Sequence, residues 1–200
     1  LEEAAGEGDP QAMVNLGNRY RAGKGGVEKN PAESDLWFRL AATKGDAIAQ
    51  HNLGLSYFTG KGNARDYAES VKWHRKAAKK GYPPAEYSMG LRYAKGKGVS
   101  QDAGEAAKWY RKAARHGHTS AQNNLGLMYR KGEGVKQDYG EALKLFRQAA
   151  ERGHVHAQFN LGNMYLKGQG VTQDRQEAKT WFTRAAEKGH KGAKKALGSM

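Results

Sequence analysis

The sequence predicts an all-α protein, a right-handed α-solenoid (superhelix) of antiparallel helix pairs built on a 36-residue repeat. Glycines recur every 36 residues, Leu-Gly or Met-Gly pairs recur beside them, and an Asp or Asn followed by Glu opens a helix in each repeat. The recurring glycines are Gly45, Gly81, Gly117, Gly153 and Gly189. Because one pair cannot bury its own apolar face, successive pairs must stack into a continuous core.

The first helix of each repeat is predicted from a four-residue signature. Ala49, Leu53, Gly54 and Tyr57 follow the i, i+4, i+5, i+8 spacing of one helical face, and other repeats carry the same signature. A glycine inside a helix costs about 1 kcal/mol relative to alanine. Its recurrence therefore predicts that a neighbouring helix approaches closely at this point.

The second helix of each repeat opens with a capping box, in which the first side chain accepts from the backbone and the Glu reaches back. The pairs are Asn30/Glu33, Asp66/Glu69, Asp102/Glu105, Asp138/Glu141 and Asp174/Glu177. A large residue and an Ala-Ala pair then mark the apolar face, and a glycine three residues later supplies the left-handed residue that ends the helix. The large residues are Trp37, Trp73, Trp109, Leu145 and Trp181.

We expect one repeat domain over residues 1–200, with residues 1–8 as the tail of a preceding repeat and residues 190–200 as a partial capping helix. The five full repeats expected between them are 9–45, 46–81, 82–117, 118–153 and 154–189. This pattern predicts a slice of a longer array, or an array with short caps. The first residues are acidic and short of an apolar run, so they do not resemble a signal peptide.

Composition narrows the classes of partner and chemistry. A formal net charge of +14 favours an anionic partner, and an acidic protein, a nucleic acid and a membrane surface all qualify. The absence of Cys excludes a disulfide scaffold and thiol catalysis. No stretch approaches the roughly 18 consecutive apolar residues that a membrane span needs.

The repeat as a whole resembles the Sel-like repeat, a relative of the tetratricopeptide repeat. Residues 121–153 follow its pattern A-x-x-x-L-G-x-x-Y-x-x-G-x-G-V-x-x-D-x-x-x-A-x-x-W-x-x-x-A-A-x-x-G, with Leu145 at the Trp position. Departures are local: Met89 replaces Leu, and Pro83-Pro84 opens the third unit. The resemblance implies a non-catalytic scaffold or adaptor, as in endoplasmic-reticulum quality control, bacterial signalling and host contact, and immunity against secreted toxins.

The same resemblance places the partner on the first helices, which line the concave face of tetratricopeptide-like arrays. We expect a protein or peptide partner, acidic in character, bound by a chain that is monomeric on its own and uses no cofactor. The candidate partner-binding residues are Asn18, Arg21, His51, Leu55, Phe58, Tyr87, Leu91, Asn123, Leu127, Arg130, Phe159, Asn163 and Leu166. Their mixture of apolar, aromatic and polar side chains is typical of binding surfaces. The alternative is that the apolar members pack against neighbouring helices.

A ladder of polar residues precedes the Leu-Gly pairs: Asn15, Asn52, Asn124 and Asn160, with Ser88 in the third repeat. Asn both donates and accepts, so the ladder could hold the backbone of an extended ligand. The alternative, favoured by its presence in the outermost repeat, is that these side chains bond the protein itself.

Metal and nucleotide sites are disfavoured. The Gly-x-Gly segments follow helices and contain no Gly-Lys-Ser/Thr, so turn geometry explains them. The His116-x-His118 and His154-x-His156 pairs have no evident third ligand. His118, His154 and His190 are repeat-equivalent, which predicts a shared structural role at a helix start. No acid, base or nucleophile cluster stands outside the repeat pattern, so we assign no catalytic residue and no metal ligand.

The basic runs at residues 72–76 and 108–112 interleave aromatics with Lys and Arg, as nucleic-acid patches do. Their aromatics fall on the buried face and their cations on the outer face of the second helices, which favours a solvated convex surface. Binding of nucleic acid or an anionic surface through this basic convex face remains the alternative function. Salt sensitivity separates the two, because counterion-driven binding weakens steeply as salt rises.

Overall fold

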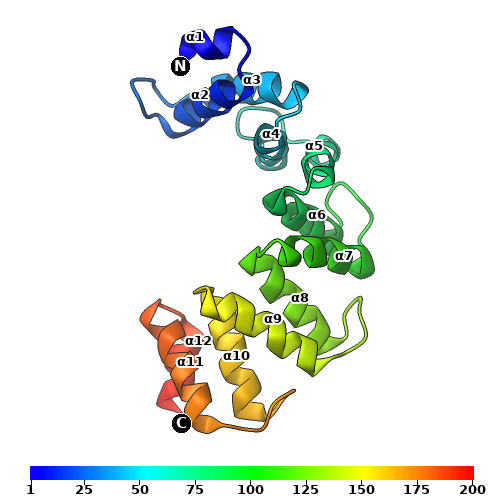
Figure 1. Ribbon diagram of the computed structural model, residues 1–200, viewed down its shortest axis with the longest axis vertical. Coiled ribbons are helices and arrows are strands. Elements are labelled where there is room, and N and C mark those ends of the chain that lie inside the picture. Colours follow the sequence, from blue (N-terminus) through cyan, green and yellow to red (C-terminus); the bar gives the residue numbers. More distant parts are fainter. The chain divides into compact units, whose positions relative to one another are not determined.

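The computed structural model describes residues 1–200 as twelve α-helices without strands (Figure 1). Each helix packs on its sequence neighbours within two compact units, residues 1–102 and residues 103–200. The helices are α1 (Glu2–Gly6), α2 (Pro10–Ala22), α3 (Pro31–Thr43), α4 (Ala47–Thr59), α5 (Tyr67–Lys79), α6 (Pro83–Lys95), α7 (Ala103–Arg115), α8 (Thr119–Lys131), α9 (Tyr139–Glu151), α10 (Val155–Lys167), α11 (Arg175–Glu187) and α12 (Lys191–Gly198). The all-helical fold of paired helices is confirmed. None of these helices has the length and apolar character required to cross a membrane.

The second helices begin as the sequence predicts, but with a different reciprocal bond. Asn30 accepts from the Glu33 amide at 3.1 Å, and Asp66, Asp138 and Asp174 cap α5, α9 and α11 in the same way. The capping residue's own N–H donates to the carbonyl of the preceding repeat Tyr, as from Asp138 to Tyr129 at 2.9 Å. This bond fixes the first helix to the start of the second, and it replaces the reach-back by Glu expected from sequence.

The second helices end at the predicted glycines. At the end of α3 the Gly45 amide donates to the Ala42 carbonyl and the Asp46 amide to the Ala41 carbonyl, while Gly45 has φ of 95°. These two bonds around a left-handed residue form a Schellman motif, which favours glycine. The Ala-Ala pair thus supplies both small core side chains and the carbonyls that close the helix.

The helical glycine lies against a ring of the following second helix, and this ring belongs to the residue after the Trp position. A Cβ placed on Gly126 would lie 2.8 Å from Cε1 of Phe146, and one on Gly54 would lie 2.9 Å from Cδ2 of His74. We call the residue after each Trp or Leu of the second helices the ring position; its five members are Phe38, His74, Tyr110, Phe146 and Phe182, all at most 3% exposed. Close helix approach is confirmed, with the ring position as its target.

The Trp residues lie at the margin of the core. Trp73 and Trp181 are each 6% exposed, and a cation from the same helix covers each ring: Lys76 on Trp73 at 4.3 Å and Arg184 on Trp181 at 4.6 Å. The Trp therefore separates the ring position from the outer face of the second helices.

Several outer cations hold the repeats together. In four of the five second helices an Arg donates to the hydroxyl of the Tyr in the next first helix, 18 residues on: Arg39 to Tyr57, Arg75 to Tyr93, Arg111 to Tyr129 and Arg147 to Tyr165, at 2.5 to 3.3 Å. Lys80, Arg152 and Lys188 donate to the carbonyls of Gly45, Gly117 and Gly153. Part of the net positive charge is thus committed to the fold.

Candidate partner-binding site

The thirteen predicted partner-binding residues all lie on first helices, at different depths. Asn18 is exposed, and Asn123 is buried at 6% exposure, with Oδ1 accepting from Asn160 at 2.9 Å. The other eleven are partly buried. Two hollows, one in each compact unit, gather five of the thirteen: Arg21 and Leu55 in one, and Arg130, Phe159 and Asn163 in the other.

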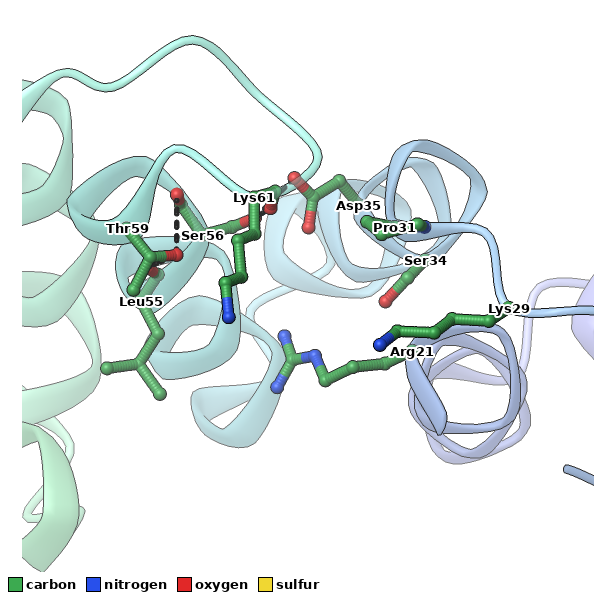
Figure 2. A pocket seen from close by; sticks show the side chains of 9 residues that line it. All are labelled: Arg21, Lys29, Pro31, Ser34, Asp35, Leu55, Ser56, Thr59 and Lys61. Carbon is green, nitrogen blue, oxygen red and sulfur yellow. Dashed lines mark hydrogen bonds between the residues drawn. The ribbon is translucent and has the colours of Figure 1, made fainter. Parts of the chain in front are cut away.

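The N-terminal hollow is a cavity of about 260 Å³ between α2, α3 and α4 (Figure 2). Its wall consists of Arg21, Lys29, Pro31, Ser34, Asp35, Leu55, Ser56, Thr59 and Lys61. Arg21 enters from the last turn of α2, and the two lysines come from the loops that precede α3 and follow α4. The Arg21 guanidinium and the Lys29 and Lys61 amino groups point toward the shared space.

Arg21 is held in place at the mouth of this hollow. Its guanidinium donates to Asn52 Oδ1 at 3.1 Å and to the Asn52 carbonyl at 3.4 Å, and it lies 4.4 Å from the centre of the Phe38 ring. Burial lowers the pKa of Arg21, with the Asp35 carboxylate opposing that shift. Two of the five guanidinium donors are used in these bonds, which leaves the others available to an anion.

Asp35 is the acidic group of the N-terminal hollow, and it is 4% exposed. Its Oδ2 accepts from the Ser56 hydroxyl and from the Asn63 amide. Burial raises the pKa of Asp35, and the bond from Ser56 together with the charges of Arg21 and Arg39 opposes the rise. The carboxylate in the cavity wall therefore already accepts hydrogen bonds from neutral donors.

The C-terminal hollow has a volume of about 420 Å³ and is lined by Arg130, Phe159, Asn160, Asn163, Lys167 and Gln169. Arg130 lies in the last turn of α8, at the repeat position that Arg21 holds in α2, and its guanidinium lies 6.0 Å from the centre of the Phe146 ring. Asn163 Nδ2 donates to the Phe159 carbonyl at 3.1 Å. This hollow combines two cations, three amides and an aromatic wall, without a carboxylate.

The other predicted residues pack mainly against their own units. The Phe58 ring is covered by the Arg92 guanidinium at 3.4 Å and lies 5.2 Å from the Tyr67 ring. Phe159, although it lines a hollow, also stacks on His190 at 4.4 Å. Leu127 and Leu166 pack against the cores of the second unit. The packing alternative raised from sequence thus describes part of these side chains, and their role in binding stays a prediction.

The polar ladder is used inside the protein. Asn52 accepts from Arg21, Asn160 donates to Asn123, and Asn124 accepts from the Asn123 amide at 3.3 Å. These bonds join consecutive first helices or neighbouring residues of one helix. They support the structural interpretation of the ladder over ligand binding.

The repeat-equivalent histidines are helix N-caps. His118, His154 and His190 accept through Nδ1 from the amides of Ala121, Ala157 and Ala193, at 3.1 to 3.3 Å. Accepting a hydrogen bond requires the neutral ring. Burial is the main cause that lowers the pKa of all three, and for His154 the charges of His156 and His118 add to it. The expected structural role at a helix start is confirmed.

Five residues of the N-terminal hollow were not predicted from sequence: Lys29, Ser34, Asp35, Ser56 and Lys61. Four of them lie on or beside the start of a second helix or in a loop, outside the first-helix face. For Ser34, Asp35 and Ser56 the signal was departure from the repeat. Later repeats carry mostly Ala at the position of Ser34, mostly an apolar residue at the position of Asp35, and mostly Met at the position of Ser56.

Comparison with known proteins settles the family. The Sel1 repeat profile matches residues 10–46, 47–82, 83–118, 119–154 and 155–190. The chain belongs to the Sel1 repeat family. Sel1 repeat proteins are protein-interaction scaffolds and are typically non-catalytic. No curated protein sequence matches the chain.

Solved structures of Sel1 repeat proteins are similar to the chain over nearly its whole length. A protective antigen of uropathogenic Escherichia coli is 40% identical with a TM-score of 0.94 over 99% of this chain, which spans 42% of that protein. A Sel1 repeat protein from Oxalobacter formigenes is 40% identical with a TM-score of 0.87, covering 94% of this chain and 75% of that one. The immunity protein Pa5087 of Pseudomonas aeruginosa shares the fold at 23% identity and a TM-score of 0.61, covering 93% of this chain and 71% of its own.

Proposed function

We propose that this Sel1 repeat chain is a non-catalytic binding module that holds an acidic protein or peptide on the first-helix faces of its two units. One observation carries the proposal. Arg21 and Arg130 hold the same repeat position, and each lies at a hollow lined by consecutive first helices. Cations, amides and apolar walls side by side are the mixture that protein partners use as anchors.

The charge of the chain suits such a partner. A net charge of +14 raises the association rate with acidic proteins and disfavours basic ones. Within this class we propose a bacterial adaptor, or an immunity protein that neutralises a secreted effector. The shared fold with a Pseudomonas aeruginosa immunity protein shows that this architecture occurs in that role.

The outer face supports the alternative less well. A second-helix hollow of about 390 Å³ is lined by Lys72, Arg75, Lys76 and Lys79 among others. Lys72 pairs with Glu69 at 2.7 Å, Arg75 donates to Tyr93, and Lys76 covers Trp73. Because three of these cations are engaged, fewer remain for phosphate groups.

The test compares matched variants in one unit. Arg130→Gln/Asn163→Ala removes one cation and one amide from the C-terminal hollow. Lys144→Gln/Gln148→Ala removes the same groups from the outer face of α9, where both line another hollow. Each variant is immobilised and exposed to lysate of the source organism at about 0.15 M salt, then washed at about 0.5 M, across which surface charge is increasingly screened.

We expect the parent to retain a specific protein through the wash, and the inner-face variant to bind it about tenfold more weakly, as loss of an anchor does. The outer-face variant should bind like the parent. Retention of nucleic acid alone, released by salt and reduced by the outer-face variant, would move the function to the basic outer face of the second helices.

A further inference from the structure

The N-terminal hollow contains a buried hydroxyl without a partner. Ser34 is 1% exposed, and its Oγ has no hydrogen-bond partner although it lines the cavity. In Figure 2 this oxygen is directed to the same space as the Arg21 guanidinium and the Lys29 amino group. A desolvated hydroxyl without a partner is costly, so a ligand that accepts from it recovers that cost.

The three cations around this hydroxyl are not paired with a carboxylate. Arg21 donates to Asn52 only, and neither Lys29 nor Lys61 forms an ion pair. The one carboxylate in the wall, Asp35, receives its bonds from Ser56 and Asn63. Three convergent positive charges and one negative charge give the cavity wall an excess of positive charge.

The repeat itself provides an internal control. The equivalents of Ser34 in the last three repeats are Ala106, Ala142 and Ala178, and two equivalents of Ser56 are Met128 and Met164. Those repeats form the same helices with the same bounds relative to the repeat. The fold therefore does not require the polar residues of the N-terminal hollow.

We propose that the N-terminal hollow binds the carboxylate of an acidic side chain on the partner polypeptide. The inference rests on the proposed function, since it names the group of the partner that is held. Arg21 presents unused guanidinium donors to the carboxylate, Lys29 and Lys61 neutralise it, and the Ser34 hydroxyl donates to one of its oxygens. Leu55 at the same wall contacts the methylene groups of the bound side chain.

A carboxylate fits this cavity better than a phosphate group. Ser34 is a single hydroxyl donor in the wall, and the Asp35 carboxylate can only accept hydrogen bonds, so the additional oxygens of a phosphate group would meet a like charge without a donor. The planar guanidinium also matches the two oxygens of a carboxylate in a bidentate arrangement.

The experiment uses the full chain and N-acetyl-glutamate amide as the monoanionic probe. NMR follows the backbone amide signal of Leu55, which lines the same cavity and is retained in every variant, during titration at constant ionic strength. We expect binding with a Kd in the millimolar range, typical of one small anion. N-acetyl-glutamine amide, the neutral analogue, should leave the signal unchanged, and inorganic phosphate should bind more weakly than the carboxylate.

Matched variants separate a ligand role from a structural one. Ser34→Ala should weaken carboxylate binding about three- to tenfold while the thermal midpoint stays the same or rises, because other repeats carry Ala there. Arg21→Gln should weaken binding at least about tenfold. Arg19→Gln, an exposed arginine on the same helix, should have no effect. Equal binding of the neutral analogue, tighter binding of phosphate, or unchanged affinity in Ser34→Ala and Arg21→Gln would each overturn the proposal.

The same variants keep this inference separate from the proposed function. If the partner protein is retained by the parent and equally by Ser34→Ala and Arg21→Gln, the carboxylate site is wrong while protein binding stands. If the probe binds with the expected pattern but no protein is retained, the carboxylate site stands and the proposed function fails.

Discussion

The two compact units are built from the same repeat but differ in what they bury. Residues 1–102 bury Asp35, Glu86, Arg92 and His74, together with Ser34, Ser56 and Ser70. In residues 103–200 the buried polar side chains are four amides, Gln122, Asn123, Gln158 and Asn160. The second unit is therefore the regular form of the repeat, and the first carries polar exceptions, most of them at positions that are mainly apolar elsewhere, whereas Glu86 stands where three other repeats have Gln.

The amides common to both units show which polar groups the repeat itself needs. Gln50, Gln122 and Gln158 each donate to the carbonyl of the second Ala of the preceding Ala pair, at 3.1 to 3.3 Å. These bonds recur in both units, so they belong to the architecture. The exceptions of the first unit are not found in the second unit, and buried groups of that kind cost stability unless something compensates.

The largest expected effect tests the ring position in the two units. Phe146→Ala should lower the free energy of unfolding by about 3–5 kcal/mol, because it removes a fully buried ring from a regular core. His74→Ala should cost less than half as much, since it also removes a desolvated Nε2 that has no partner. Urea unfolding followed by circular dichroism measures both, with the exposed loop variant Lys136→Ala as control. Equal losses would show that the first unit is packed as regularly as the second.

A smaller effect is expected when His74 is replaced by Phe, the residue that α9 and α11 of the second unit carry at the ring position. His74→Phe should stabilise the protein by about 1–3 kcal/mol at neutral pH, because the unpartnered nitrogen is gone and Gly54 already accommodates a ring at this distance. Burial, then the charges of His51 and Arg92, keep the pKa of His74 well below its ordinary value, and the bond with Ser70 opposes them.

The pH dependence of that difference has a definite sign. The folded parent keeps His74 neutral while the unfolded chain gains a proton below about pH 6.5, so the parent loses stability as the pH falls from there toward the folded pKa. His74→Phe lacks this titrating group. The difference in free energy of unfolding between the variant and the parent should therefore grow as the pH falls from about 7.5 to about 5.5. Urea unfolding at both pH values checks this, and parallel curves would exclude His74 as the cause of acid sensitivity.

The smallest effect concerns helix caps, where the units also differ. Asp46 caps α4 in the first unit through its carboxylate at 2.7 Å, whereas His154 caps α10 through Nδ1. Because the folded pKa of His154 is lowered by burial and by its histidine neighbours, its capping contribution is complete above about pH 6.5 and is lost as the pH falls. His154→Asp should leave stability nearly unchanged at neutral pH and raise it by about 0.5–1 kcal/mol near pH 5.5. No gain at the lower pH would mean that the imidazole cap contributes nothing measurable.

Most of the fold could be predicted because its determinants are local and periodic. The capping Asp, the Ala pair with its glycine, and the helical Gly54 act through bonds and contacts within one repeat or its neighbour. The ring position was missed because Trp is the larger residue and its neighbour varies among Phe, Tyr and His. Which of two adjacent side chains faces inward depends on a rotation of the helix by about 100° per residue, and the pattern of hydrophobic residues does not resolve that.

The sequence by itself determined the repeat, the helix pairs, the helix ends and the family of this protein. The tertiary structure alone decided which side chains surround the candidate binding cavity. Arg21, Ser34 and Lys61 come from three different segments and share no periodic spacing, and only the packing of α2, α3 and α4 brings them around one cavity. Short-range bonds fix helices from sequence, whereas a site depends on the directions of long side chains across a packed interface, which sequence spacing does not encode.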